Sequence, residues 1–239
     1  SHEIAKRAIG ACYGFWRHPL QRPNHMVPGL ASRAWHEASQ FPWVAILESR
    51  WLDIRSEMEA LQLSDADGEG WPEVRGHDRT LAGDTGVWRE FPLLGVSADA
   101  EALARCRCPV TTRLLSGVDA IRAHCDLRVG EETALFSRMT PGTRLRPHCG
   151  PTNTHLTCHL GLHIPDRCYI RVGGETRQWE EGKCIVFDDS WEHEVWHDGS
   201  SVRVVLLVRF WHPDIDSAHR ELLLREEARE RQSKAWILE

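Results

Sequence analysis

Two histidines from distant parts of the chain, His148 and His193, are the residues whose type and setting best suit chemistry. Each lies in a turn-rich stretch at the end of an expected strand. Imidazole nitrogen binds Fe, Zn, Cu and Ni alike, so the ligands alone do not choose the metal. A Cys-x-x-Cys pair does not accompany them, which excludes a compact zinc finger. A single histidine is more often a polar or core residue than a ligand. It is therefore the pair that predicts a metal centre.

An arginine, Arg203, begins an apolar segment ten residues after His193. Its planar guanidinium can grip a carboxylate through two parallel hydrogen bonds, although a charge at a strand end can equally be exposed to solvent. Ser137 can add a hydroxyl to the same carboxylate, and His159 can donate to a second one near the metal. The set predicts a dicarboxylate held by Arg203 at one end and chelating the metal at the other.

The third metal ligand is less clear from the sequence. The usual oxygen-activating centre has two histidines and one carboxylate, with open positions for oxygen and cosubstrate. In its common form the carboxylate lies two residues after the first histidine, where this chain has Gly150. Asp188 and Asp189 precede His193 closely. They either supply a carboxylate through water or cap the turn before Trp191.

Short strands must position these groups, because the hydrophobic period changes to two after Thr133. The clearest strand is Thr154–Ile164, where an apolar face alternates with a polar face that looks either at water or into a polar cavity. The expected strands are Gly86–Gly95, Leu135–Thr140, Arg144–His148, Thr154–Ile164, Cys168–Val172, Glu175–Trp179, Cys184–Phe187 and Arg203–Trp211.

Helical patterns surround the strands. The expected helices are Glu3–Phe15, Trp43–Leu61, Ala98–Arg105, Val118–Cys125 and Ala218–Trp236. Many short strands preceded by covering helices indicate a mainly β protein, a small jelly roll or barrel with an N-terminal helical layer. We expect one domain over residues 1–239, with helical support over about 1–130, the β region over about 131–213 and a C-terminal helix over about 216–238.

Composition restricts the partners. The formal net charge of -6 gives no general attraction to nucleic acid or to anionic membranes. The sequence shows neither a long apolar run nor a signal-peptide pattern, so we expect no membrane contact by this stretch itself. The eight cysteines are irregularly spaced. We expect mostly free thiols and leave one or two disulfides open.

These residues and their surroundings resemble the aspartyl/asparaginyl β-hydroxylases, which are iron(II)- and 2-oxoglutarate-dependent dioxygenases. The resemblance covers about residues 28 to 213 and is dense from Ser137 onward. The runs that carry it are Met139–Thr143, Pro147–Asn153, His159–Leu162, Trp179–Lys183, Phe187–Trp196 and Trp211–Pro213, together with Arg203.

The resemblance implies a double-stranded β-helix (jelly-roll, cupin-like) in which His148 and His193 bind iron(II). Arg203 and Ser137 would hold the distal carboxylate of 2-oxoglutarate, and His159 the carboxylate beside the keto group. Trp88 would lie near this cofactor pocket, and Asp189 would act in catalysis through water. Glycine at position 150 is shared by the family. The implied reaction is hydroxylation of a peptide or protein side chain with O2. The implied location is the lumen of the endoplasmic reticulum or secretory pathway, as a domain of a single-pass membrane protein.

One departure concerns the substrate. The hydroxylases carry arginines at the positions of His155 and Thr157, which would bind the oxidised side chain. Thr157 cannot pair bidentately with a carboxylate, and His155 is at best partly charged near neutral pH. A second hypothesis is therefore a degenerate module that keeps metal and 2-oxoglutarate but only binds or senses. A third is a cupin-like isomerase or metal store, which does not need Arg203 in the cavity.

Overall fold

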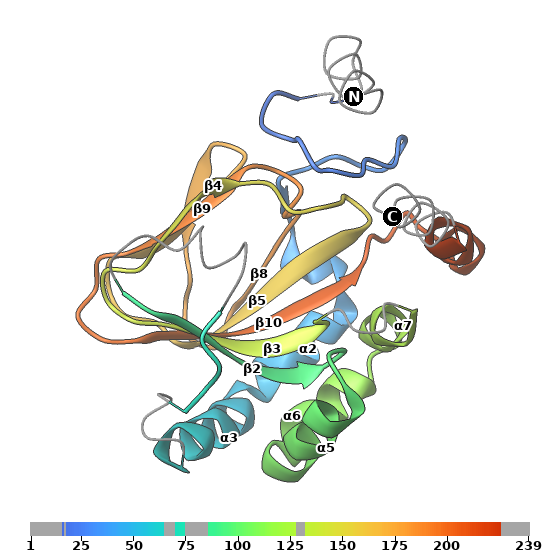
Figure 1. Ribbon diagram of the computed structural model, residues 1–239. Helices are drawn as coiled ribbons and strands as arrows, with labels where there is room; N and C mark the ends of the chain where they lie inside the picture. Colours follow the sequence, from blue (N-terminus) through green and yellow to red (C-terminus); the bar gives the residue numbers. More distant parts are fainter. Residues whose placement is uncertain (1–15, 17, 65–69, 75–85, 128–131, 226–239) are drawn as a thin grey trace, which may run out of the picture.

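Two antiparallel β-sheets form the centre of the protein, which we describe from a computed structural model covering residues 16, 18–64, 70–74, 86–127 and 132–225. The larger sheet has the strand order β1-β8-β5-β10-β3-β2, and the smaller has the order β4-β9-β6-β7 (Figure 1). The strands are β1 (Trp35–His36), β2 (Trp88–Leu94), β3 (Ala134–Met139), β4 (Arg144–His148), β5 (His155–His163), β6 (Cys168–Val172), β7 (Glu175–Gln178), β8 (Cys184–Phe187), β9 (His193–His197) and β10 (Arg203–Trp211). This arrangement confirms the predicted jelly-roll class.

Two strands were not expected. His193 was expected at a turn-rich strand end, and it is the first residue of β9, a strand that was not itself predicted. Strand β9 escapes the alternation test because its side chains are mostly polar and only Val195 and His197 are buried. Strand β1 is only two residues long and pairs with β8 at the edge of the larger sheet, so it carries no periodic signal.

The larger sheet separates two environments. On β5, Leu156, Cys158 and Leu160 are fully buried and belong to the apolar core shared with the helices. The alternate residues Thr157 and His159 line a cavity on the other side. Strand alternation therefore predicted the two faces correctly, and the polar face looks into a cavity rather than into water.

Helices cover one face of the larger sheet, opposite the smaller sheet (Figure 1). They are α2 (Pro42–Ser49), α3 (Trp51–Ser64), α5 (Ala98–Arg107), α6 (Pro109–Ser116) and α7 (Asp119–Leu127), with the short 3-10 helix η1 (Ala38–Gln40) before them. Residues 217–225 are also helical. The expected helix Glu3–Phe15 and the end of Ala218–Trp236 lie outside the described residues.

Two helix predictions are wrong in detail. The single helix expected over Trp43–Leu61 is divided at Arg50, which has φ -111 and ψ 14 and so departs from helical values. No helix was expected between Arg105 and Val118, but Pro109 starts α6 there. Proline is favourable at a first helical position, because that position has no intrahelical use for an N–H donor.

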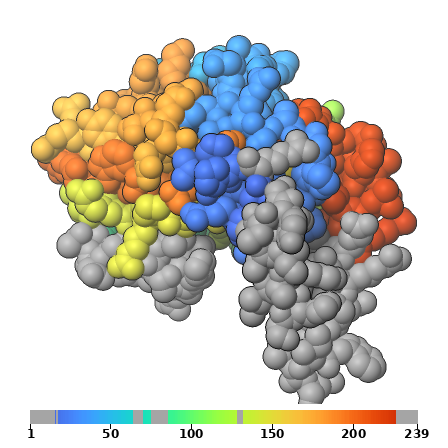
Figure 2. Space-filling view, turned by 90° about the horizontal axis from the view of Figure 1, so that it is seen from above, coloured from blue at the N-terminus to red at the C-terminus, as the bar shows by residue number. Residues whose placement is uncertain are grey.

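The N-terminal segment 18–36 packs across the smaller sheet and the turn before β9. Figure 2 shows this blue segment against the orange residues of the smaller sheet. Glu192 N donates to Leu20 O, and Arg22 Nη2 forms an ion pair of 2.6 Å with Glu192. Segment 18–36 is therefore part of the structure that surrounds the site.

The described cysteines are free thiols, and Cys12 lies outside the described residues. Among the helices in the described ranges, we find none with the length and apolar character needed to cross a bilayer.

Helix α3 offers a matched test of the core between helices and sheet. Leu61 is 1% exposed and packs in that core, whereas Leu63 on the same helix is 79% exposed. Leu61→Ala should lower the free energy of unfolding by about 2–5 kcal/mol, because it removes buried methyl groups and leaves a cavity. Leu63→Ala should change it by less than about 0.5 kcal/mol. Urea unfolding measures both, and equal effects would contradict the described packing.

Candidate functional site

A cavity of about 320 Å³ lies between the two sheets. Its floor comes from the inner faces of β3, β5 and β10, and its opposite wall from β4, β6 and β9. The lining includes most of the predicted site residues, namely Trp88, Ser137, His148, Thr157, His159, Asp189, His193 and Arg203. Residues separated by more than a hundred positions thus meet in one space.

The two histidines of the predicted metal centre are direct cross-strand partners. His148 ends β4, His193 begins β9, and the two are opposite each other in the antiparallel register. Their ring centroids are 4.1 Å apart. Side chains directly opposite in an antiparallel pair lie close together on the same face, so the strand pairing itself brings both imidazoles to one point.

The hydrogen bonds of both rings select the same tautomer. His148 Nδ1 lies 2.7 Å from Arg146 O, and His193 Nδ1 lies 2.9 Å from Trp191 O. A carbonyl accepts only from a protonated nitrogen, so the neutral ring carries its lone pair on Nε2, the atom that a metal requires. Burial lowers the pKa of His193, which keeps this imidazole neutral at neutral pH. Both rings are therefore prepared as ligands.

Among the described residues, we find no third His, Cys, Asp or Glu that completes a three-ligand cluster with the two histidines. The surroundings of Gly150 explain why no larger side chain fits at this position. A Cβ at Gly150 would lie 2.8 Å from Asp189 Oδ1, and Gly150 N donates to Asp189 O at 2.7 Å. The Asp189 side chain thus occupies the space that a side chain at position 150 would need.

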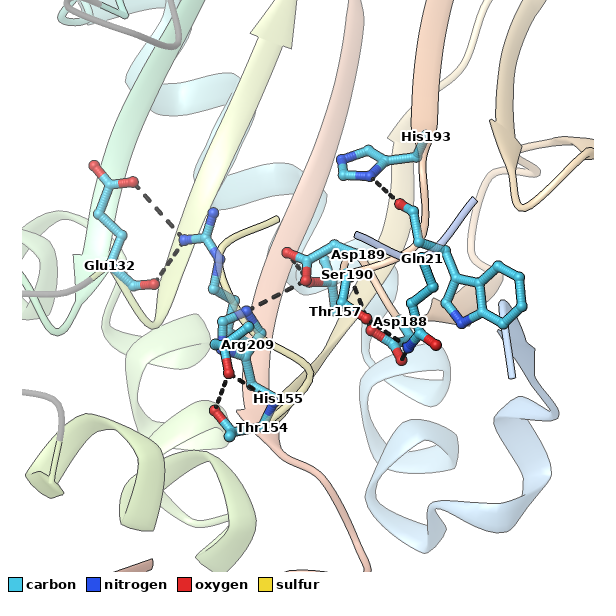
Figure 3. Close-up of polar contacts among 12 residues, drawn as sticks. Gln21, Glu132, Thr154, His155, Thr157, Asp188, Asp189, Ser190, His193 and Arg209 are labelled. Atoms are coloured by element: carbon cyan, nitrogen blue, oxygen red, sulfur yellow. Dashed lines mark hydrogen bonds and ion pairs between the residues drawn. The ribbon is translucent and has the colours of Figure 1, made fainter. Parts of the chain in front are cut away.

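The two aspartates before β9 have different tasks. Asp188 Oδ1 accepts from Ser190 N at 2.9 Å, and Asp188 Oδ2 and Ser190 Oγ both accept from Gln21 Nε2. Figure 3 shows these three side chains together, with Asp189 beside Thr157. Burial raises the pKa of Asp188 to about 7. Asp188 therefore caps the turn, and Asp189 lines the cavity.

Asp189 is buried, and its surroundings favour the carboxylate form. Thr157 Oγ1 donates to Asp189 Oδ2 at 3.3 Å, and His155 Nε2 lies 3.4 Å from Oδ1. Burial raises the pKa of Asp189, but the contact with His155 and the charge of Arg209 outweigh this effect and hold that pKa well below its usual range. An ionised carboxylate therefore stands next to the histidine pair.

Arg203 lies at another part of the cavity and is only 1% exposed. Its Nη1 donates to Ser137 O at 3.3 Å, its Nη2 lies 2.8 Å from Met139 Sδ, and its guanidinium carbon is 4.9 Å from the Trp179 ring centroid. In the described part of the chain, no ion pair joins Arg203 to a carboxylate, and Arg203 Nε has no hydrogen-bond partner. A buried cation without an anion is costly, so this guanidinium suits an anionic ligand.

Two further groups direct hydrogen-bond capacity into the cavity. Trp179 Nε1 donates to His159 Nδ1 at 3.2 Å, so neutral His159 carries its proton on Nε2, which has no partner among the described residues. Burial, then the charge of Arg203, keeps the pKa of His159 well below its usual value. Trp88 Nε1 donates to Ser137 Oγ at 3.0 Å, which leaves the hydroxyl proton of Ser137 for another acceptor.

The two residues predicted to bind substrate, His155 and Thr157, differ in their relation to the cavity. Thr157 lines the cavity, whereas His155 is absent from the described lining. His155 lies two residues before Thr157 on β5, and its ring is 5.6 Å from the ring of His124 on α7. His155 acts on the site through its contact with Asp189.

The sequence analysis missed several members of the lining. Arg209 enters the cavity from β10, two residues beyond Leu207 on the same face, and Asn24 enters from segment 18–36. The signal for Arg209 was available, because Arg203 and Arg209 share one parity of the β10 alternation. Trp179 is not among the described lining residues but donates to His159; it was expected at a strand end and within the family resemblance, but without this role.

Known proteins resemble this chain over most of its length. Residues 48–213 match the family described as aspartyl/asparaginyl beta-hydroxylase. The aspartyl/asparaginyl beta-hydroxylase of Mus musculus is 38% identical over 220 residues, which cover 90% of this chain and 28% of the mouse protein. Aspartate beta-hydroxylase domain-containing protein 2 of Xenopus tropicalis is 34% identical over 189 residues, covering 75% of this chain and 47% of that protein.

A bacterial relative is similar to the same degree. The ornithine lipid ester-linked acyl 2-hydroxylase of Rhizobium tropici is 34% identical over 181 residues, covering 74% of this chain and 60% of that protein. The chain spans less than two thirds of the length of each of these three relatives. The matched stretch 48–213 contains the histidine pair, Asp189 and Arg203. On this similarity, the chain belongs to the aspartyl/asparaginyl β-hydroxylase family.

Proposed function

We propose that the protein is an iron(II)- and 2-oxoglutarate-dependent dioxygenase that hydroxylates a side chain of a peptide or protein. The observation that carries this proposal is the buried guanidinium of Arg203 in the same cavity as the His148–His193 pair. A cation without an anionic partner and two imidazoles prepared as metal ligands together suit a dicarboxylate that chelates a metal. Membership of a hydroxylase family supports the same reaction class.

The residues present fit both groups. His148 and His193 would hold iron(II) through Nε2, and Asp189 would act through water on a further metal position. Arg203 and the hydroxyl of Ser137 would hold the distal carboxylate of 2-oxoglutarate. The orphaned Nε2–H of His159 would donate to the carboxylate beside the keto group. Bound together, iron(II) and 2-oxoglutarate would supply oxidation of a substrate C–H bond by O2, with 2-oxoglutarate converted to succinate and carbon dioxide.

The chain's own share of this reaction is orientation and exclusion of water. The fork of Arg203 sets the direction of the cosubstrate, because it is itself held by Ser137 O and Met139 Sδ. His193 is held by the carbonyl of Trp191, and Asp189 by Thr157. Fixed groups of this kind lower the reorganisation needed during reaction.

Two other functions were considered. A binding module that keeps metal and 2-oxoglutarate without turnover is the second candidate, because His155 is not among the described lining residues and Thr157 donates its hydroxyl to Asp189. Succinate formation separates it from the enzyme. The cupin-like isomerase or metal store would be favoured by Arg203 turned to solvent, and Arg203 is buried.

The metal assignment is tested with His193→Ala. This change should weaken Mn(II) binding, used as an oxygen-inert substitute for iron(II), by about a hundredfold or more, because one of two protein ligands is lost and even supporting residues around a ligand contribute ten- to hundredfold. Succinate release with iron(II) should be abolished. Electron paramagnetic resonance of free Mn(II) measures the binding. His219→Ala, on an exposed helix, is the control and should bind Mn(II) normally. Unchanged affinity in His193→Ala would contradict the assignment.

The cosubstrate assignment is tested with Arg203→Gln. Loss of the charge-assisted contacts, which contribute about 1.5–3 kcal/mol, should weaken 2-oxoglutarate binding about ten- to hundredfold. Arg203→Lys should fall between, because lysine keeps the charge but not the planar fork. Calorimetric titration of the Mn(II)-loaded protein gives the affinities. Arg171→Gln is the control, since Arg171 pairs with Glu194 outside the cavity. An equal loss in that variant would argue against a specific role for Arg203.

The relation between Asp189 and Gly150 gives a relocation test. Asp189→Gly should weaken Mn(II) binding by removing the carboxylate, and Gly150→Asp alone should also weaken it by crowding Asp189. The double change Gly150→Asp with Asp189→Gly should recover part of the affinity, because the carboxylate returns from the other side of the same space. The neutral pair Gly150→Asn with Asp189→Gly should not. If both double variants bind equally, the charge of Asp189 does not serve the metal.

A further inference from the structure

The cavity contains a second guanidinium that the metal and cosubstrate do not use. Arg209 lies on the same face of β10 as Arg203 and six residues further along, which is roughly 20 Å of extended strand. Both arginines line the cavity. Arg203 is fully buried, whereas the side chain of Arg209 is 28% exposed. Arg209 therefore stands towards the open part of the cavity, where a substrate would enter.

Among the described residues, the side chain of Arg209 makes one hydrogen bond and one long ion pair. Its Nη1 donates to Glu132 O at 2.8 Å, and the Glu132 carboxylate is 3.9 Å from the same nitrogen (Figure 3). That carboxylate is 41% exposed, and a long, exposed ion pair contributes little. A guanidinium carries five N–H donors, and the backbone carbonyl of Glu132 accepts one hydrogen bond, from Nη1. A neutral acceptor thus holds Arg209 in position, and the two carboxylates that act on its charge are the half-exposed Glu132 and the buried Asp189.

The charges lining the cavity do not balance. Arg203 and Arg209 are cations, and Asp189 is the one carboxylate in the described lining. A divalent metal and the dianion 2-oxoglutarate cancel each other. The described lining therefore has two guanidinium groups, Arg203 and Arg209, and one carboxylate, Asp189, whose ionised form Arg209 favours.

The strand pairing places Arg209 opposite an uncharged residue of β5. Arg209 is the register partner of Thr157 on β5. Thr157 donates to Asp189 and carries no charge. Arg203 and Arg209 are the two arginines in the described lining of the cavity.

We propose that Arg209 determines substrate specificity by binding an oxyanion of the substrate, either a carboxylate or a phosphate group, beside the C–H bond to be oxidised. This deepens the proposed function and depends on it. Two N–H groups of a guanidinium match two oxygens of either anion. Arg209 is a binding residue for the substrate, and Arg203 is the residue for the cosubstrate.

The test uses the full chain loaded with Mn(II) and 2-oxoglutarate and blocked tripeptides of the form acetyl-Gly-X-Gly-amide. X is Glu or its neutral isostere Gln in one pair, and phosphoserine or Ser in the other. Loading with metal and 2-oxoglutarate is measured first, so a failure of the proposed function is seen separately from a failure of this inference. Binding is measured as broadening of the peptide proton signals by Mn(II), which reports closeness to the metal.

We expect the anionic peptide of at least one pair to bind about ten- to hundredfold more tightly than its neutral partner, the range for one charge-assisted contact. Arg209→Gln should remove this preference, and Arg209→Glu should reverse it in favour of acetyl-Gly-Lys-Gly-amide. A merely structural role of Arg209 would not reverse the preferred charge. Arg171→Gln, an arginine of similar exposure outside the cavity, should keep the wild-type preference.

Each outcome decides the inference. Preference in the Glu pair assigns a carboxylate, and preference in the phosphoserine pair assigns a phosphate. Equal binding of anionic and neutral peptides by the wild-type protein overturns the proposal, as does a preference that persists in Arg209→Gln. Circular dichroism of each variant shows whether it is folded. Glu132→Gln provides a second variant that leaves Arg209 intact, and it should strengthen anion binding because it removes the weak competing carboxylate.

Discussion

The pairing of β4 with β9 is the constraint on which the site depends. Both histidines belong to the smaller sheet, and the antiparallel register places them opposite each other. A slip of one residue would turn one of the two rings to the other face. Each ring is also fixed by the carbonyl two residues before it, so backbone structure alone sets the distance, the face and the tautomer. Backbone carbonyls, and not acidic side chains, therefore orient the two imidazole rings.

A second constraint is the division of labour across the larger sheet. One face of β5 and β10 is apolar and packs on helices, and the other carries polar and charged groups into the cavity. The helices supply the apolar burial that stabilises the sheet. The cost of keeping guanidinium and imidazole groups in the interior is thus met on the side away from them.

Much of this could be predicted from the sequence. The strands β4, β6, β8 and β10 were predicted with their observed bounds, and strict alternation separated the two faces of β5. The order of strands within each sheet does not follow from local pattern, since β10 lies between β5 and β3 by long-range pairing. Polar β9 and the proline-initiated α6 were missed because periodicity and a breaker rule were applied where burial and position within the helix decide.

The site was predicted less completely than the fold. The lining that the sequence suggested came from recognisable motifs around His148, His193 and Arg203. The separate tasks of Asp188 and Asp189 could not be read from two adjacent identical residues, because the choice is made by Gln21, far away in the chain. The surroundings of His155 could not be predicted either. Only the structure shows that it contacts Asp189 and His124 and is not among the described lining residues.

The contact between Gln21 and Ser190 spans 169 positions, and it has a consequence for the order of folding. During synthesis, segment 18–36 leaves the ribosome early but has nothing to dock on until β8 and the following turn have been made. Contacts of such separation close late, because the chain entropy of a long loop must be overcome first. The contacts of Gln21 with this turn should therefore form late, so the turn that carries Asp189 is expected to be among the last features of the cavity to become rigid.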